Sequence, residues 1–280
     1  MILRYIDNQN FESVAMKKIC FLFICFGILF ASDTNLQNKC NKNDAGACHN
    51  LAVQFYESKD YQNAFKYFKK ACELKFNQSC FNIGLMSEQG IGTPKDEFKA
   101  FDMFSKTCIK NKKGKYDPYF GCANLAFLYL DGRGVRQNFK AGIEILNDTC
   151  KDGNLANCEI LSNIYNDGYS GITKDTNKAM EILEFSCKKG EINACLKISN
   201  NLLDGNITDQ KKIQKGISML ENVCKLKNSE ACLKLGIYYT NGNFVKQNLT
   251  VAKEFFGIAC DLRNEKGCQS YKILNENGVK

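Results

Sequence analysis

The sequence has no tryptophan, two prolines and a single histidine, His49, in 280 residues. One histidine excludes a His-rich zinc site and leaves only one place for a Ser-His-Asp triad. The phosphate-binding pattern GxxxxGK[ST] and the zinc-protease pattern HExxH do not occur. Although Lys and Arg (38) outnumber Asp and Glu (30), no run of five basic residues indicates a nucleic-acid-binding arm. We therefore expect no metal, no cofactor and no nucleic acid.

The N-terminal region has the pattern of an export signal. A basic start, Met16 to Lys18, precedes the apolar stretch Ile19 to Phe30, which ends in small residues. We assign residues 16–32 to a signal peptide and residues 1–15 to an overhang ahead of the true start codon. The apolar stretch is too short to span a bilayer, so we expect no stable membrane span after cleavage. The mature chain is then exported, to the periplasm or the outside of the cell.

The strongest signal is the spacing of the cysteines. Of the sixteen, two lie in the predicted signal peptide and fourteen form seven consecutive pairs. Six pairs have the spacing C-x7-C, and one has C-x13-C with a lysine-rich insert. A period near 36 residues indicates stacked structural repeats. The pairs are Cys40/Cys48, Cys72/Cys80, Cys108/Cys122, Cys150/Cys158, Cys187/Cys195, Cys224/Cys232 and Cys260/Cys268.

Each repeat has the pattern of two packed helices. Apolar residues three and seven positions after the second cysteine of a pair, with a small residue at the fourth, predict a first helix, which we call helix A. A glycine at the tenth position, present in five repeats, predicts its end. A second helix, helix B, carries a small residue eight positions before the next pair: Ala64, Ala100, Gly142, Ala179, Gly216 and Ala252. Small residues let the two helices pack closely, and Tyr129, Tyr165 and Tyr239 are expected between them.

Helix geometry limits how the cysteines can pair. Residues eight apart on one helix lie about 12 Å apart, which is too far for a disulfide. A bridge within a C-x7-C pair therefore requires a chain reversal, as where helix B turns into the next helix A. The alternative pairing across each repeat, such as Cys48 with Cys72, would leave Cys40 and Cys268 unpaired. We favour the nearest-neighbour pairing.

The segment from Cys122 to Ala141 resembles the Sel-1-like repeat, a relative of the tetratricopeptide repeat, and the pattern recurs from Cys232 to Gly242. The paired cysteines are similar to those of the secreted cysteine-rich branch of this family from Helicobacter, whose members carry the name beta-lactamase. The resemblance implies an all-α fold, a right-handed α/α superhelix of about six repeats with one disulfide each. We place this solenoid at residues 33–280, with repeats near 47–80, 79–122, 121–158, 157–195, 194–232 and 231–268 and a partial last helix to 277.

The name of the resembled branch makes a beta-lactam hydrolase the alternative function. Serine enzymes of that kind use an S-x-x-K motif. The one match is Ser186 with Lys189, and no S-D-N or K-T-G element accompanies it. A packing role is favoured for Ser186, because the same position holds Ala71, Thr107, Thr149, Val223 and Ala259 in other repeats. We expect His49, near the start of the first helix A, at the surface rather than as a base.

A binding function is better supported by the repeat pattern. Asn50, Asn82 and Asn124 lie two positions after the second cysteine of their pairs, and Lys197 and Lys234 hold the same position later. If the A helices line a concave face, this ladder could hydrogen-bond an extended peptide and take a carboxylate. The alternative is that these are capping or surface residues. We expect a secreted or periplasmic scaffold that binds a protein, a peptide or a peptidoglycan-derived fragment.

Overall fold

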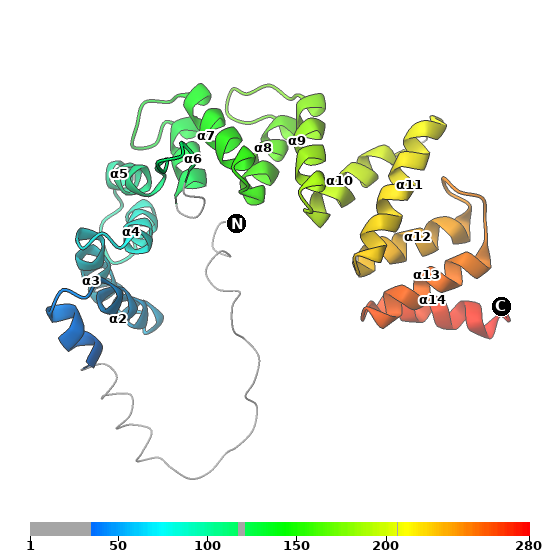
Figure 1. The fold of residues 1–280 in the computed structure, drawn as a ribbon, viewed down its shortest axis with the longest axis horizontal. Coiled ribbons are helices and arrows are strands. Elements are labelled where there is room, and N and C mark those ends of the chain that lie inside the picture. Colours follow the sequence, from blue (N-terminus) through cyan, green and yellow to red (C-terminus); the bar gives the residue numbers. More distant parts are fainter. Residues whose placement is uncertain (1–34, 117–120, 206) are drawn as a thin grey trace, which may run out of the picture. The chain divides into compact units, whose positions relative to one another are not determined.

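The structure, a computed structural model, describes residues 35–116, 121–205 and 207–280 (Figure 1). The predicted overhang and signal peptide lie outside the described residues. The chain divides into two compact units, one ending at Ser79 and the other beginning at Cys80. Within the described ranges the chain forms helices and no strand, with two isolated β-bridges. None of the described helices is long and apolar enough to cross a membrane.

A and B helices alternate along the chain, which confirms the predicted α/α solenoid (Figure 1). A short helical segment, residues 35–41, precedes the first of them. The A helices are α2 (Ala45–Glu57), α4 (Asn77–Gln89), α6 (Cys122–Asp131), α8 (Leu155–Asp167), α10 (Ile192–Leu202), α12 (Ser229–Asn241) and α14 (Glu265–Glu276). The B helices are α3 (Tyr61–Glu73), α5 (Glu97–Thr107), α7 (Phe139–Lys151), α9 (Thr176–Lys188), α11 (Gln210–Lys225) and α13 (Leu249–Asp261).

Local side-chain chemistry sets the ends of these helices. At most N-termini a short Asp or Asn side chain accepts a hydrogen bond from a backbone N–H of the first turn, as Asp96 does for α5 and Asn138 for α7. The A helices α6 and α12 end at Gly132 and Gly242, whose φ values of 69° and 72° lie in the left-handed region. Glycine adopts this conformation without steric cost, so these two predicted helix ends are confirmed.

The helix that carries Cys195 departs from this rule. The glycine ten positions after Cys195 is Gly205, and the predicted helix end at that residue is wrong, because α10 ends at Leu202 with Leu203 as its C-cap. Leu203 is buried, and a Cβ added at Gly216 of α11 would lie 2.7 Å from its Cγ. Packing of this leucine against the next helix therefore accompanies an earlier end of the A helix.

Small residues bring the A and B helices of a repeat together, as predicted. A Cβ added at Gly84 of α4 would lie 2.5 Å from Cε1 of Phe104 in α5. The same close approach occurs between Gly236 of α12 and Phe256 of α13. The predicted tyrosines lie against these cores: Tyr165 is buried, and Tyr129 and Tyr239 are half-buried. Each helix pair therefore packs through glycine or another small residue.

Disulfides close the connection between each B helix and the next A helix, which we call a joint, and one more joins the segment 35–41 to α2. Six of them have Cα–Cα distances of 4.4 to 4.9 Å and the nearest-neighbour pairing: Cys40–Cys48, Cys108–Cys122, Cys150–Cys158, Cys187–Cys195, Cys224–Cys232 and Cys260–Cys268. Cys72 and Cys80 are also disulfide-bonded. These bridges show that the alternative pairing, across each repeat, is wrong. We call the joint between Cys108 and Cys122 the long joint and that between Cys150 and Cys158 the short joint.

Candidate ligand-binding face of the A helices

The two predicted lysines connect neighbouring A helices. Lys197 Nζ in α10 donates hydrogen bonds to Glu159 Oε1 (2.6 Å) and Asn163 Oδ1 (3.3 Å) in α8. Lys234 Nζ in α12 donates to Asn200 Oδ1 in α10 (2.9 Å). In both contacts, the residue two positions after the second cysteine of one pair binds the residue five positions after the second cysteine of the preceding pair. From α8 to α12 these positions form one continuous row of side chains.

We call the two positions, taken over the A helices of the second unit, the A row. Its middle is polar, with Asn163, Lys197, Asn200 and Lys234, whereas apolar residues alternate with polar ones towards both ends. Asn163, Asn200 and Ile237 are exposed, and the two lysines are partly exposed. The full set is Asn82, Leu85, Asn124, Phe127, Ile160, Asn163, Lys197, Asn200, Lys234, Ile237, Ser270 and Ile273. Asn163 and Asn200 were not predicted, because the fifth position holds apolar residues in the other repeats.

The three predicted asparagines are not helix caps. Asn50 and Asn82 lie in the interior of α2 and α4, and Asn124 is inside the first turn of α6. The cap of α2 is Asp44, and the N-cap position of α6 is Gly121. The capping half of the alternative is therefore wrong, whereas the surface half stays open, because Asn50 is exposed and Asn82 and Asn124 are half-buried. In the described part of the chain their side-chain amides make no hydrogen bond, and Asn50 belongs to the first unit, apart from the other rungs.

The two lysines differ in charge compensation. Lys197 forms an ion pair with Glu159, in which both side chains remain partly exposed. Lys234 contacts a neutral amide, and within the described ranges it has no acidic partner. A positive charge without a nearby carboxylate attracts an anionic group more strongly than one already paired. Lys234 is therefore the stronger candidate to bind a carboxylate.

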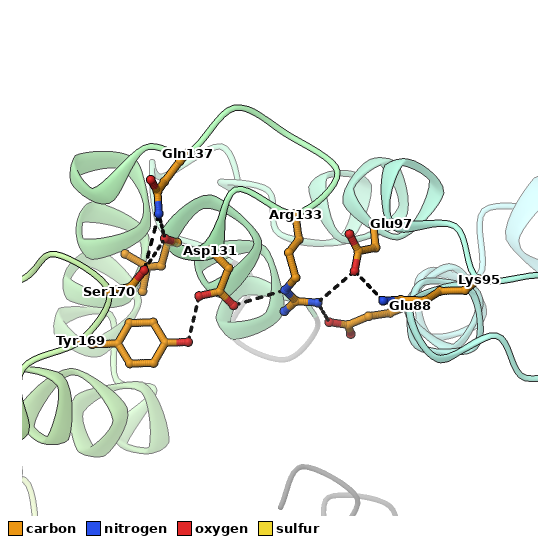
Figure 2. Close-up of polar contacts among 9 residues, drawn as sticks. Glu88, Lys95, Glu97, Asp131, Arg133, Gln137, Tyr169 and Ser170 are labelled. Carbon is orange, nitrogen blue, oxygen red and sulfur yellow. Dashed lines mark hydrogen bonds and ion pairs between the residues drawn. The ribbon is translucent and has the colours of Figure 1, made fainter.

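A polar network joins the edges of three consecutive repeats in the second unit (Figure 2). Arg133, in the loop after α6, contacts Glu88 Oε1 of α4 (2.6 Å) and Asp131 Oδ2 (3.2 Å). Asp131 also accepts a hydrogen bond (2.9 Å) from the hydroxyl of Tyr169, a residue in the loop after α8. Burial acts to lower the pKa of Arg133, but the bonds to Glu88 and Asp131 raise it above its ordinary value. The guanidinium thus stays charged and links the repeats.

A backbone carbonyl extends this network at one end and a side-chain ion pair at the other. Gln137 Nε2 (2.8 Å) and Ser170 Oγ (3.2 Å) both donate to the Leu130 carbonyl at the end of α6. At the other end Lys95 pairs with Glu97 (2.8 Å), as Figure 2 shows. Because these loops connect A helices to B helices, the network helps to fix the spacing of the A helices and hence of the A row.

The proposed catalytic pair is not assembled. Ser186 is buried, and its Oγ has no hydrogen-bond partner in the described structure. It lines a cavity of about 10 Å³, enough for no more than one water molecule. Lys189, the C-cap of α9, places its Nζ 5.7 Å from the centroid of the Phe185 ring. The related residues are buried as well, in line with a packing position: Ala71, Thr107, Thr149, Val223 and Ala259.

His49 is buried in the first unit, so its expected place at the surface is wrong. Its Nδ1 lies 2.8 Å from Ser79 Oγ, and its ring lies against Phe68 and Phe76. Burial lowers the pKa of the imidazole. The repeat pattern indicated that this position is buried, because Phe81 and other apolar residues hold it in several repeats. In the described ranges no group of three or more His, Cys, Asp or Glu side chains could hold a metal ion.

Alternating helix pairs that present a row of side chains define an α/α repeat scaffold. The family model described as the Sel1 repeat matches residues 45–76, 77–111, 120–151, 158–191 and 229–264, more than half of the chain. The chain belongs to the Sel1 repeat family.

One predicted repeat lies almost wholly outside these matches. Residues 192–228, which include Cys195 and Cys224, are not matched, although we expected a repeat near 194–232. They contain α10 and α11, the pair in which the A helix ends before its glycine. The bridges Cys187–Cys195 (Cα–Cα 4.8 Å) and Cys224–Cys232 (4.9 Å) still close the joints on both sides of this pair. Residues 192–228 therefore have the helices and disulfides of a repeat although the family model does not match them.

Curated relatives include eukaryotic and bacterial proteins. Cytochrome c oxidase assembly factor 7 of Xenopus tropicalis is 31% identical over 192 residues, covering 64% of this chain and 72% of the relative. Beta-lactamase HcpA of Helicobacter pylori strain J99 is 33% identical over 86 residues, covering 31% and 32%. Cytochrome c oxidase assembly factor 7A of Xenopus laevis is 33% identical over 108 residues, covering 36% and 44%. This chain therefore spans less than half the length of two of these relatives.

Solved structures share the fold. The protective antigen c5321 of uropathogenic Escherichia coli, described as displaying an SLR fold, has a TM-score of 0.58 at 19% identity, covering 88% of this chain and 52% of that one. A Sel1 repeat protein from Oxalobacter formigenes has a TM-score of 0.54 at 24% identity, covering 78% and 88%. At these identities the likeness is one of fold alone.

Proposed function

We propose that this chain is an exported repeat scaffold that binds a protein, a peptide or a peptidoglycan-derived fragment along the A row. The observation that carries the proposal is the pair of contacts from Lys197 to Asn163 and from Lys234 to Asn200, which join the A helices side by side. The disulfides support an oxidising compartment, the periplasm or the outside of the cell.

The chemistry of the A row suits an extended segment. A side-chain amide both donates and accepts hydrogen bonds, so Asn82 and Asn124 can pair with the N–H and C=O groups of a bound backbone. Lys234 can bind a carboxylate of the ligand by a charge-assisted hydrogen bond. Leu85 and Phe127 at one end and Ile237 at the other offer apolar surface for its side chains.

The test begins with peptides selected from a random library on the oxidised mature chain. A selected peptide is then titrated against the parent chain and the variants Asn124→Ala and Lys234→Ala. We expect each variant to bind about tenfold more weakly, the loss of one hydrogen bond to a backbone or a charged group. Lys140→Ala, on the exposed surface of the B helix α7, is the matched control and should bind as the parent does. Unchanged affinity in both A-row variants would exclude the A row as the site.

The beta-lactam hydrolase is the alternative, on the strength of the names of Helicobacter pylori relatives and of the Ser186–Lys189 motif. Its buried serine, without a bond to lysine, speaks against it. Ring opening of a chromogenic beta-lactam by the oxidised chain, beside Ser186→Ala, tests it directly. We expect no turnover in either protein. Turnover that disappears in the variant would establish the enzyme instead.

A further inference from the structure

The long joint contains a lysine-rich turn with a defined conformation. Lys110 and Tyr116 form an antiparallel bridge at its base. At the tip Asn111 Oδ1 accepts hydrogen bonds from the backbone N–H groups of Lys113 (2.9 Å) and Lys115 (3.2 Å). Gly114, with φ +74°, donates its N–H to the Asn111 carbonyl. The turn is therefore held by its own side-chain and backbone hydrogen bonds.

The turn is also tied to a helix that follows it in the solenoid. Lys110 Nζ contacts Asp148 Oδ2 of α7 (3.1 Å) and lies 4.8 Å from the centroid of the Tyr116 ring. The backbone N–H of Tyr116 donates to Asp152 Oδ2 (2.9 Å). The disulfide of the long joint closes the segment below these contacts. Its orientation on the second unit is thus set by contacts outside the turn itself.

Three lysines of this turn serve none of these contacts. Lys112, Lys113 and Lys115 are exposed, and in the described ranges their amino groups form no ion pair. Of the nearby carboxylates, Asp148 binds Lys110 and Asp152 accepts a backbone N–H, while Asp117 lies outside the described residues. Within the described ranges the turn therefore presents three positive charges in four residues with which no carboxylate forms an ion pair. The other joints have shorter loops, so this feature is an addition to the repeat.

We propose that this lysine turn, Lys112, Lys113 and Lys115, docks an acidic segment of a partner protein at a site separate from the A row. Holding the lysines in an ordered turn lowers the entropy lost when carboxylates bind. An anionic membrane fits less well, because three lysines contribute only about 3 kcal/mol at a lipid surface and the tip has no apolar side chain to insert. Nucleic acid fits less well too, because residues 110–116 contain no arginine and the ring of their one aromatic residue, Tyr116, already lies against Lys110.

The experiment uses a fluorescent octaglutamate peptide and the full oxidised chain. The turn variant combines Lys112→Gln, Lys113→Gln and Lys115→Gln. The control variant combines Lys211→Gln, Lys246→Gln and Lys266→Gln, three exposed lysines elsewhere, so both variants lose the same charge. We expect the parent to bind, the turn variant to bind at least tenfold more weakly and the control less than twofold more weakly. Binding should also weaken as salt screens the charges.

Other outcomes would overturn the proposal. Equal losses in the two variants would mean that net charge alone drives binding, and no loss in the turn variant would place the peptide elsewhere. Capture by vesicles containing phosphatidylglycerol, lost in the turn variant and without peptide binding, would assign the turn to a membrane. Asn111→Ala keeps every charge but removes the two side-chain hydrogen bonds at the tip, so it should weaken binding several-fold. An unchanged affinity would contradict the need for an ordered turn.

Discussion

The long joint connects α5 to α6 and the short joint connects α7 to α8, and the two differ mainly in what lies between their cysteines. The cysteines lie 14 positions apart in the long joint and 8 positions apart in the short one, yet both disulfides have a Cα–Cα distance of 4.7 Å. The helix ends are thus held in the same way, while the loop length varies freely. The extra residues of the long joint form the lysine turn without changing how the helices are stapled.

The buried side-chain contacts beside the two disulfides differ more than the disulfides themselves. In the short joint Asn157 Nδ2 donates to Thr149 Oγ1 (2.8 Å), and both residues are buried. In the long joint Thr107 bonds only to carbonyls of its own helix. There Gly121 lies against Thr107 Oγ1 and the Phe104 ring, and an added Cβ would lie 3.3 Å from Cδ1 of that ring. One joint is supported by a polar contact and the other by an aromatic ring over glycine.

The largest effect should come from removing that ring. Phe104→Ala deletes a fully buried side chain that also packs over Gly84, so we expect a loss of about 3–5 kcal/mol in unfolding free energy. Leu146→Ala, at the same position ahead of the short joint, should cost less. Urea unfolding of the oxidised chain, followed by circular dichroism, measures both. A larger loss at Leu146 would show that the ring is not the main support of the long joint.

Removing either disulfide should cost nearly the same. In the chain-entropy description a loop of this size contributes about 2.5–3 kcal/mol, and the longer loop adds less than about 0.5 kcal/mol. The double variants Cys108→Ala/Cys122→Ala and Cys150→Ala/Cys158→Ala test this in the same unfolding assay. If the two losses differed by more than about 1 kcal/mol, the joints would not be stapled equivalently.

A smaller effect should separate the two threonines. Thr149→Val leaves the buried Asn157 amide without its acceptor, so we expect a loss of about 1–3 kcal/mol. Thr107→Val removes only bonds to its own helix and should cost less than about 1 kcal/mol, because Val223 fills this position in another joint. Comparable losses in the two variants would mean that the Asn157 contact does not support the short joint.

The smallest effect on stability is expected from lowering the pH, which protonates His49. The His49 ring lies against Phe76 in the turn before α4. Burial holds the pKa of His49 below 6.5 in the folded first unit, so the unfolded chain binds a proton first as the pH falls. Stability is therefore complete above about pH 6.5 and decreases as the pH falls from there towards the folded pKa. Melting temperatures between about pH 5 and 7 measure it. His49→Phe, which matches Phe81 in the next repeat, should abolish this dependence, and a persistent slope would assign it to other groups.

The features that repeat locally could be predicted from the sequence. Helix pairs, small packing residues and the cysteine pairing all depend on neighbours within one period, so their spacing carried the information. Where Leu203 ends α10 ahead of Gly205, packing against the next helix outweighed the local signal. His49 was misplaced because a polar residue type was weighed above a position that is apolar elsewhere.

Features that cross from one repeat to another were harder to predict. The network of Glu88, Arg133 and Asp131 could not be found from the sequence, because its members come from different repeats and follow no period. The A row was predicted in half, since its fifth-position residues vary from amide to apolar. Contacts between repeats therefore depend on the three-dimensional stacking, which spacing along the chain does not report.

The nearest-neighbour pairing of the cysteines has a consequence for how the chain oxidises. When a chain enters an oxidising compartment N-terminus first, the closest available thiol to the second cysteine of each pair is its native partner. Closing a loop of about ten residues takes roughly 10–100 ns, so the correct partners meet often before distant thiols emerge. Each pair also lies within one period of the sequence. A duplicated or deleted repeat would carry a whole pair with it, and the remaining cysteines would keep their partners.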